Sequence, residues 1–91
     1  MSQNLQVPYL YTLLGDNSEY LEIVGARSIT CYTTGGATNI VNSDGQDMDL
    51  PDGVAIELSA DTGNTFTQVI ITPAGGVTAF VSMLGGNATK F

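Results

Sequence analysis

Hydrophobic and polar residues alternate along several short segments of this chain with the two-residue period of a β-strand. Residues 20–24 place Leu21 and Ile23 on one side, opposite Tyr20 and Glu22. Residues 54–60 alternate in the same way, and the apolar residues that share one face are Val54, Ile56 and Leu58. No segment of comparable length keeps the 3.6-residue period of an amphipathic helix.

Turn-forming residues separate these segments at short, regular intervals. Glycine, proline, asparagine and aspartate cluster at residues 15–18, 25–27, 35–36, 44–45, 51–53, 61–64, 73–76 and 85–87. The segments between them are rich in Val, Ile, Thr, Tyr and Phe, which suit a pleated surface. The pattern predicts an all-β fold of about seven short strands, arranged as a small antiparallel β-sandwich or barrel.

Two segments near the C-terminus carry apolar residues on both faces. They are residues 66–72 and 77–84, and a turn at 73–76 separates them. A strand that is apolar on both sides is typical of a sheet covered on both faces. We therefore predict that these segments pair as the two central strands.

A chain of 91 residues is the length of one domain. We divide it into an N-terminal arm or edge strand over residues 1–14 and a single β domain over 15–91, which ends in a short flexible tail. Pro8 limits strand pairing near the N-terminus to a sheet edge. We predict that an arm and a terminal aromatic plug contact a partner subunit. The residues expected at this interface are Val7, Tyr9, Tyr11, Leu13 and Phe91.

The charge balance restricts the classes of partner. Nine carboxylates face two cations, Arg27 and Lys90, so the formal net charge is −7. Proteins that bind nucleic acid neutralise several phosphates with Lys and Arg, so we expect no nucleic-acid partner. Anionic membrane surfaces are disfavoured for the same reason, and we expect no membrane partner.

The residues that support most catalysis and cofactor binding are scarce. The chain has no histidine and one cysteine, so it can form neither an internal disulfide nor a zinc site of His and Cys ligands. We expect Cys31 to be a small buried apolar residue, because no imidazole is present to activate it. The N-terminus has no cationic region before its apolar run, so we expect no secretion signal and synthesis in a cytoplasm. We predict a protein that is not an enzyme and that has no catalytic residues and no cofactor.

One triplet, Asp61-Thr62-Gly63, is similar to the signature of aspartic proteases. That chemistry needs two such carboxylates, one from each subunit, and a longer C-terminal portion than the 30 residues that follow Asp61. We interpret the triplet as a turn in which Gly63 supplies a positive φ.

Four carboxylates cluster between residues 44 and 52, which raises a calcium hypothesis because Ca²⁺ takes six to eight oxygen ligands. The alternative is a hairpin that turns at Asp44-Gly45, with Asp47 and Asp49 facing solvent and Met48 and Leu50 facing inward. The sequence leaves both open for the cluster of Asp44, Asp47, Asp49 and Asp52.

Residues 50–58 and 66–81 resemble, in their strand-and-turn composition, the small structural proteins of tailed bacteriophages. The closest resemblance is to capsid decoration, or cement, proteins. It implies a β-sandwich or barrel on the outside of the shell, made in the host cytoplasm and located in the virion. The implied partners are the major capsid protein or other virion subunits and further copies of the chain, with a trimer as one form.

Two alternatives stay open at this point. A head–tail connector or tail subunit is compatible with the same fold. A small carbohydrate-binding module, with Tyr9 and Tyr11 as its aromatic platform, belongs to a different class of function.

Overall fold

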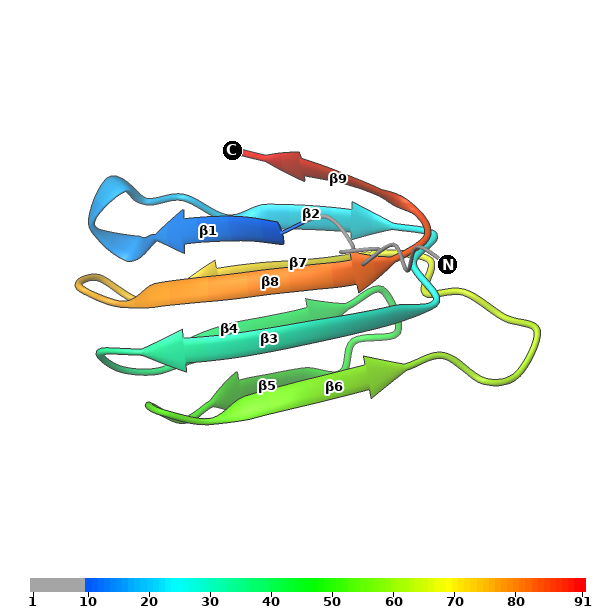
Figure 1. The fold of residues 1–91 in the computed structure, drawn as a ribbon, viewed down its shortest axis with the longest axis horizontal. Coiled ribbons are helices and arrows are strands. Elements are labelled where there is room, and N and C mark those ends of the chain that lie inside the picture. The colour runs from blue at the N-terminus through cyan, green and yellow to red at the C-terminus, as the bar shows by residue number, and fades with distance from the viewer. Residues whose placement is uncertain (1–9) are drawn as a thin grey trace, which may run out of the picture.

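Two antiparallel β-sheets face each other across a hydrophobic core in the computed structural model, which describes residues 10–91 (Figure 1). The four-stranded sheet has the order β1 (Leu10–Leu14), β8 (Thr78–Leu84), β3 (Ser28–Thr34) and β6 (Ala55–Ser59). The five-stranded sheet has the order β5 (Asp47–Leu50), β4 (Thr38–Asn42), β7 (Val69–Pro73), β2 (Leu21–Val24) and β9 (Asn87–Lys90). A single 3₁₀ turn, η1 (Gly15–Asn17), follows β1. The predicted all-β fold is confirmed, and the two separate sheets make it a sandwich.

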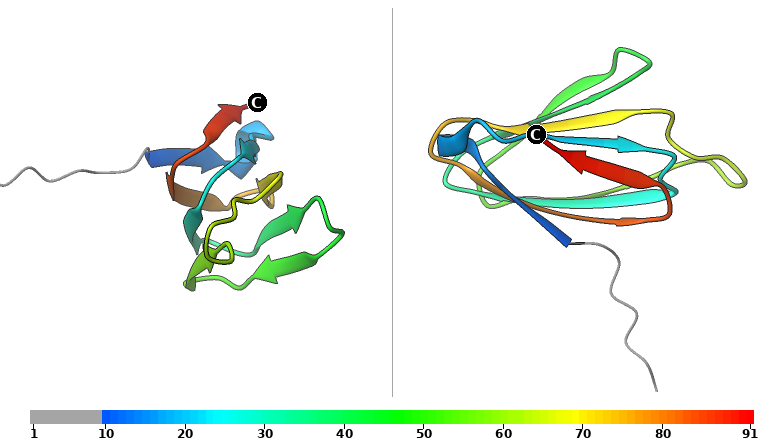
Figure 2. Two further views of the ribbon diagram at one scale, coloured as in Figure 1. Left: turned by 90° about the vertical axis from the view of Figure 1, so that its right-hand side faces the viewer. Right: turned by 90° about the horizontal axis from the view of Figure 1, so that it is seen from above.

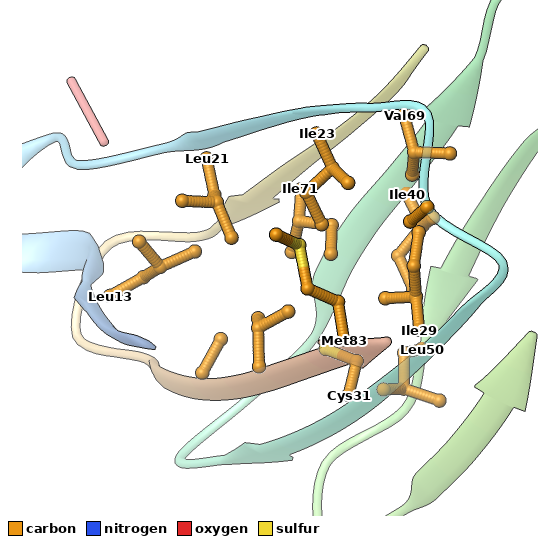
Figure 3. Packing of buried hydrophobic residues seen from close by; sticks show 13 residues of the cluster. Leu13, Leu21, Ile23, Ile29, Cys31, Ile40, Leu50, Val69, Ile71 and Met83 are labelled. Carbon is orange, nitrogen blue, oxygen red and sulfur yellow. The ribbon is translucent and has the colours of Figure 1, made fainter. Parts of the chain in front are cut away.

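The core lies between the sheets and is built from the inward side of each strand (Figure 3). Leu21 and Ile23 are fully buried, as the alternation of residues 20–24 predicts. Ile56 and Leu58 of β6 are partly buried and pack against the same core. The buried aliphatic, Ala, Cys and Met side chains of the cluster are Leu13, Leu21, Ile23, Ala26, Ile29, Cys31, Ile40, Leu50, Val69, Ile71, Ala79, Val81 and Met83.

The pairing predicted for the two apolar segments is wrong. β7 and β8 belong to different sheets, and the turn at 73–76 carries the chain from one sheet to the other. Each strand meets the core on one side only: Val69 and Ile71 face inward on β7, whereas Phe80 and Leu84 of β8 are exposed. The apolar residues on both sides of these segments therefore mean that some apolar side chains lie on the outer surface of the sandwich. They do not indicate a second layer that covers the sheet.

The described residues form nine strands, two more than the approximate number predicted. The prediction of a flexible C-terminal tail is also wrong, because residues 87–90 form β9 on the edge of the five-stranded sheet. Gly85 and Gly86 adopt positive φ values of 73° and 76°, which turn the chain from β8 into β9. The backbone of Phe91 continues the pairing by exchanging two hydrogen bonds with Tyr20, of 2.9 and 3.2 Å. The four residues of β9 are Asn, Ala, Thr and Lys and show no apolar alternation, so the sequence pattern gives this strand no signal.

At one end of the sandwich, two connections between strands are in close contact. The amide of Gly15 donates a 2.8 Å hydrogen bond to the carbonyl of Val77. A β-carbon at position 15 would overlap the carbonyl oxygen of Ala74. The turn after β1 therefore packs directly on the turn before β8, with room for glycine alone.

The buried polar groups of the described residues are all paired: no buried side-chain nitrogen or oxygen in residues 10–91 lacks a partner. The hydroxyl oxygens of Thr33 and Thr38 lie 2.8 Å apart, and both residues are fully buried. The Thr33 hydroxyl donates to the carbonyl of Gly36 over 2.9 Å. Because a hydroxyl has one proton, the Thr38 hydroxyl is the donor in the bond between the two threonines.

Candidate binding surface

Leucine, aromatic and hydroxyl side chains cover the outer face of the four-stranded sheet. Strand alternation and register place Thr12, Phe80, Tyr32 and Ala55 in one row across its four strands. Glu57 is the one charged residue among the outward positions of these strands. We call this surface the low-charge face, and its residues are Leu10, Thr12, Leu14, Ser28, Thr30, Tyr32, Thr34, Ala55, Glu57, Ser59, Thr78, Phe80, Ser82 and Leu84.

The apolar side chains of the low-charge face are well exposed. The exposed fraction is 65% for Leu10, 55% for Leu84 and 39% for Phe80. The rings of Tyr32 and Phe80 meet edge to face, with centroids 6.2 Å apart. This contact fixes two aromatic side chains near the middle of the face, where a partner could cover them with little loss of rotamer freedom.

The outer face of the five-stranded sheet has a different character. Glu22, Asp47 and Asp49 project from it, on strands β2 and β5. The side-chain amide of Asn39 donates to Asp47 over 2.6 Å and to Asp49 over 3.0 Å. The two broad surfaces of the sandwich, which lie back to back (Figure 2), therefore differ in charge: one carries three carboxylates and the other carries one.

Of the residues predicted at the partner interface, the three that the structure describes do not lie together on one surface. Val7 and Tyr9 lie outside the described residues. Tyr11 and Leu13 are on the inward side of β1, where Leu13 is fully buried and Tyr11 packs against the core. The exposed side chains of this edge strand are instead those of Leu10, Thr12 and Leu14.

Phe91 is 54% exposed, but it lies at the edge of the five-stranded sheet. Its ring stacks on Tyr20, with centroids 4.8 Å apart and planes 16° from parallel. Phe91 is thus part of a folded edge and is not at the end of a free tail.

The acidic segment forms the predicted hairpin. Gly45 has a φ of 82°, Asp47 and Asp49 are exposed, and Leu50 is buried. Asp52 lies in a different loop and accepts a 2.9 Å hydrogen bond from the amide of Gly35. Within residues 10–91, no group of three or more His, Cys, Asp or Glu side chains gathers closely enough to hold a metal ion. The geometry gives the calcium hypothesis no support.

Two other groups with possible chemistry, the Asp61-Thr62-Gly63 triplet and the Cys31 thiol, belong to the structural framework of the fold. The Asp61-Thr62-Gly63 triplet is a turn, with a 2.8 Å hydrogen bond from the amide of Asn64 to the carbonyl of Asp61 and a φ of 82° at Gly63. Burial raises the pKa of the Cys31 thiol to about 11, so the thiol stays protonated at neutral pH. Both predictions, a turn and a buried cysteine, are confirmed.

One ion pair of the described residues lies beside the edge of the five-stranded sheet. The Glu19 carboxylate accepts a 2.9 Å hydrogen bond from the amide of Leu14 and lies 3.3 Å from the ammonium of Lys90. The Leu14 amide, with Lys90 adding to it, lowers the pKa of Glu19 from its ordinary value. The pair connects the end of β1 to β9, on the flank where these two edge strands lie (Figure 1).

No helix within the described part of the chain is long and apolar enough to cross a bilayer. In comparisons with known proteins, no family model matches this chain, and no curated protein or solved structure shows significant similarity to it. Functional inference therefore depends on the surface itself. Two sequence signals could have revealed the low-charge face. One is the set of apolar residues at the outward alternate positions of 77–84, and the other is Leu10 and Leu14 beside the buried Leu13.

Proposed function

We propose that this protein is a non-enzymatic structural subunit of a virion, and specifically a decoration protein that binds the outer shell. The observation that carries the proposal is the low-charge face. It exposes Leu10, Phe80 and Leu84 around a single carboxylate, in a chain with a net charge of −7. A surface on which exposed leucine and aromatic side chains lie among hydroxyl groups, with so little charge on an otherwise acidic protein, is typical of a protein-binding surface.

The size of the face favours attachment to a repeating surface. Four strands spaced about 4.8 Å apart, with about six residues each at about 3.4 Å per residue, cover on the order of 400 Å² in projection. A stable pairwise interface buries about 800 Å² of accessible surface on each partner. A single copy makes one contact through this face, whereas an oligomer bound to several neighbouring subunits gains from multivalency. We therefore propose that the chain acts as a homo-oligomer, for which a trimer is one form.

The charge distribution is consistent with a bound subunit on the outside of a particle. With the low-charge face against the shell, the five-stranded sheet directs Glu22, Asp47 and Asp49 toward solvent. A negatively charged outer surface keeps particles apart. The proposed partner is the major capsid protein, and the proposed location is the virion after synthesis in the host cytoplasm.

The experiment compares two matched substitutions by co-sedimentation with virus particles from a culture that expresses the chain. Leu84→Asp introduces a charge on the low-charge face, and Val24→Asp introduces the same charge at an exposed apolar residue of the five-stranded sheet. Circular dichroism checks that both variants keep the β fold. We expect the wild-type chain and Val24→Asp to sediment with particles, and Leu84→Asp to lose at least tenfold in bound fraction, because burying an unpaired charge is costly.

Equal binding by both variants, or no association of the wild-type chain with particles, would contradict the proposal. Quantitative mass spectrometry of the particles gives the copy number. Hundreds of copies per particle are expected for a decoration protein. About a dozen or fewer would instead identify a head–tail connector and would overturn the decoration assignment.

A further inference from the structure

A polar cavity of about 380 Å³ lies at the end of the sandwich where the β4–β5 hairpin meets the long connection between β6 and β7. This connection projects beyond the sheets at the right of Figure 1. Amide, carboxylate and hydroxyl side chains make up most of the lining, and one aromatic residue, Phe66, contributes to it. The residues used in the argument below are Asn42, Asp44, Gln46, Asp61, Asn64 and Gln68.

Backbone hydrogen bonds hold the walls of the cavity in place. The amide of Ser43 donates to the carbonyl of Gln68 over 3.0 Å and so joins the hairpin to the β6–β7 connection. The amide of Phe66 donates to the carbonyl of Ala26 over 2.8 Å, and its side chain packs against the core. The cavity is therefore preformed, which reduces the ordering cost of binding a ligand.

The polar side chains divide into a fixed set and an available set. The Asn42 side chain accepts from the amides of Asp44 and Gln46, each over 3.0 Å, and donates to the Gln46 side chain over 2.7 Å. These bonds make the hairpin wall rigid. The side chains of Asp61, Asn64 and Gln68 make no hydrogen bond within residues 10–91, so their donors and acceptors are available to a ligand.

The charge of the lining restricts the ligand. Two carboxylates, Asp44 and Asp61, and no cation line the cavity, so phosphates, nucleotides and sulfated sugars are disfavoured. Two carboxylates are also few for Ca²⁺, which takes six to eight oxygens. A ligand that both donates and accepts hydrogen bonds without a net charge fits this lining best.

A smaller apolar cavity adjoins the polar one, and Phe66 lines both. The second cavity, of about 290 Å³, shares Asn42, Gln46 and Phe66 with the first and is lined further by Met48 and Leu58. A pyranose ring has hydroxyl groups at its rim and C–H groups on its face, and some sugars carry a methyl group. A polar wall beside an aromatic side chain and an apolar recess matches that distribution.

We propose that this cavity binds a neutral saccharide, with Asp61, Asn64 and Gln68 contacting hydroxyl groups and Phe66 contacting the C–H face of the ring. The apolar recess favours an acetamido sugar over one without a methyl group. This site is separate from the low-charge face and does not depend on the function proposed for it. It also differs from a platform that includes Tyr11, whose side chain packs against the core.

The test is a titration of the full-length chain, followed by two-dimensional amide NMR, with N-acetylglucosamine, its disaccharide and glucose. Typical ligand efficiencies place a ligand of about fifteen non-hydrogen atoms at a Kd on the order of 1 mM. We expect saturable shifts at residues 42–46 and 61–68, with tighter binding of N-acetylglucosamine than of glucose. Gln68→Ala and Asn64→Ala should each weaken binding about tenfold or more, which is the effect of losing about 1.4 kcal/mol of hydrogen bonding.

The matched control is Asn87→Ala, which removes an exposed amide from β9, outside the cavity, and should leave the affinity unchanged. Absence of saturable shifts with all three sugars would overturn the proposal. Shifts of the same amides on addition of Ca²⁺ alone would also overturn it and would identify a cation site. Co-sedimentation with particles should be unaffected in Gln68→Ala, so this proposal and the decoration proposal fail independently.

Discussion

The buried Thr33–Thr38 pair leads to a prediction about two substitutions that are chemically identical but unequal in effect. Thr33 is both donor and acceptor: it donates to the carbonyl of Gly36 over 2.9 Å and accepts from Thr38 over 2.8 Å. Thr38 acts only as a donor in this chain of bonds. Replacing either residue with valine keeps the shape of the side chain and removes its hydroxyl group.

The two variants leave different groups unpaired. Thr33→Val leaves the buried Thr38 hydroxyl without an acceptor and removes the donor to Gly36, so we expect a loss of about 2–3 kcal/mol in the free energy of unfolding. Thr38→Val removes one bond to an oxygen that keeps its own donated bond, and we expect a loss of about 0.5–1 kcal/mol. The double variant has no orphaned donor, so its loss should be about 1 kcal/mol smaller than the sum of the single losses.

Equilibrium unfolding in urea, followed by circular dichroism and by the fluorescence of the four tyrosines, measures these differences. The slope against urea concentration should stay constant across the variants, so that shifts of the midpoint report stability alone. In thermal unfolding, each kcal/mol should lower the Tm by about 4–8 °C for a chain of this size. A Thr38→Val loss equal to or larger than that of Thr33→Val would show that the donor assignment is wrong.

Three further predictions concern a close contact, a buried thiol and an ion pair. Gly15→Ala should cost on the order of 3 kcal/mol in urea unfolding because its β-carbon overlaps the neighbouring turn, whereas Gly75→Ala, whose β-carbon meets open space, should cost less than about 1 kcal/mol. Cys31, with a pKa of about 11, should resist iodoacetamide at pH 8 in the folded protein and react at the rate of a free thiol once urea unfolds it; equal rates would contradict its burial. The pKa of Glu19 is lowered by folding from 4.5, so its contribution is complete above about pH 5 and lost as the pH falls through the folded-state value; Glu19→Gln should remove this part of the pH dependence of unfolding.

The features that could be predicted from the sequence are those set by neighbouring residues. Alternation within residues 20–24 determines that Leu21 and Ile23 share the buried side, since the side chains of a strand alternate between its two faces. The Asp44-Gly45 hairpin is predictable for the same reason: the turn residues and the alternation of Asp47, Met48 and Asp49 lie within a few positions of one another. These predictions need no knowledge of the partner strand.

The features that could not be predicted depend on which strands meet in space. β1 alternates, but Leu10 and Leu14 are as apolar as Tyr11 and Leu13, so the sequence cannot tell which side faces the core. The same ambiguity affects β8, whose exposed Phe80 and Leu84 place apolar residues on the side that faces away from the core. In both strands, the uncertainty arises because the low-charge face itself carries exposed leucine and phenylalanine side chains, and this is the surface to which we assign the function. The binding surface thus falls where hydrophobic alternation is a poor guide.

The order in which strands pair has a consequence for the biosynthesis of this protein. β1 pairs with β8, so that Leu10 lies opposite Ser82, and β2 pairs with β9, so that Leu21 lies opposite Lys90. β1 and β2 leave the ribosome before the other strands of the sandwich. They cannot complete their hydrogen-bonded pairing until β8 and β9 have also emerged. Sheets built from such distant segments assemble slowly, in about milliseconds to seconds. The sandwich is therefore completed only after β9 has left the ribosome, and until then the nascent chain exposes unpaired strands to chaperones.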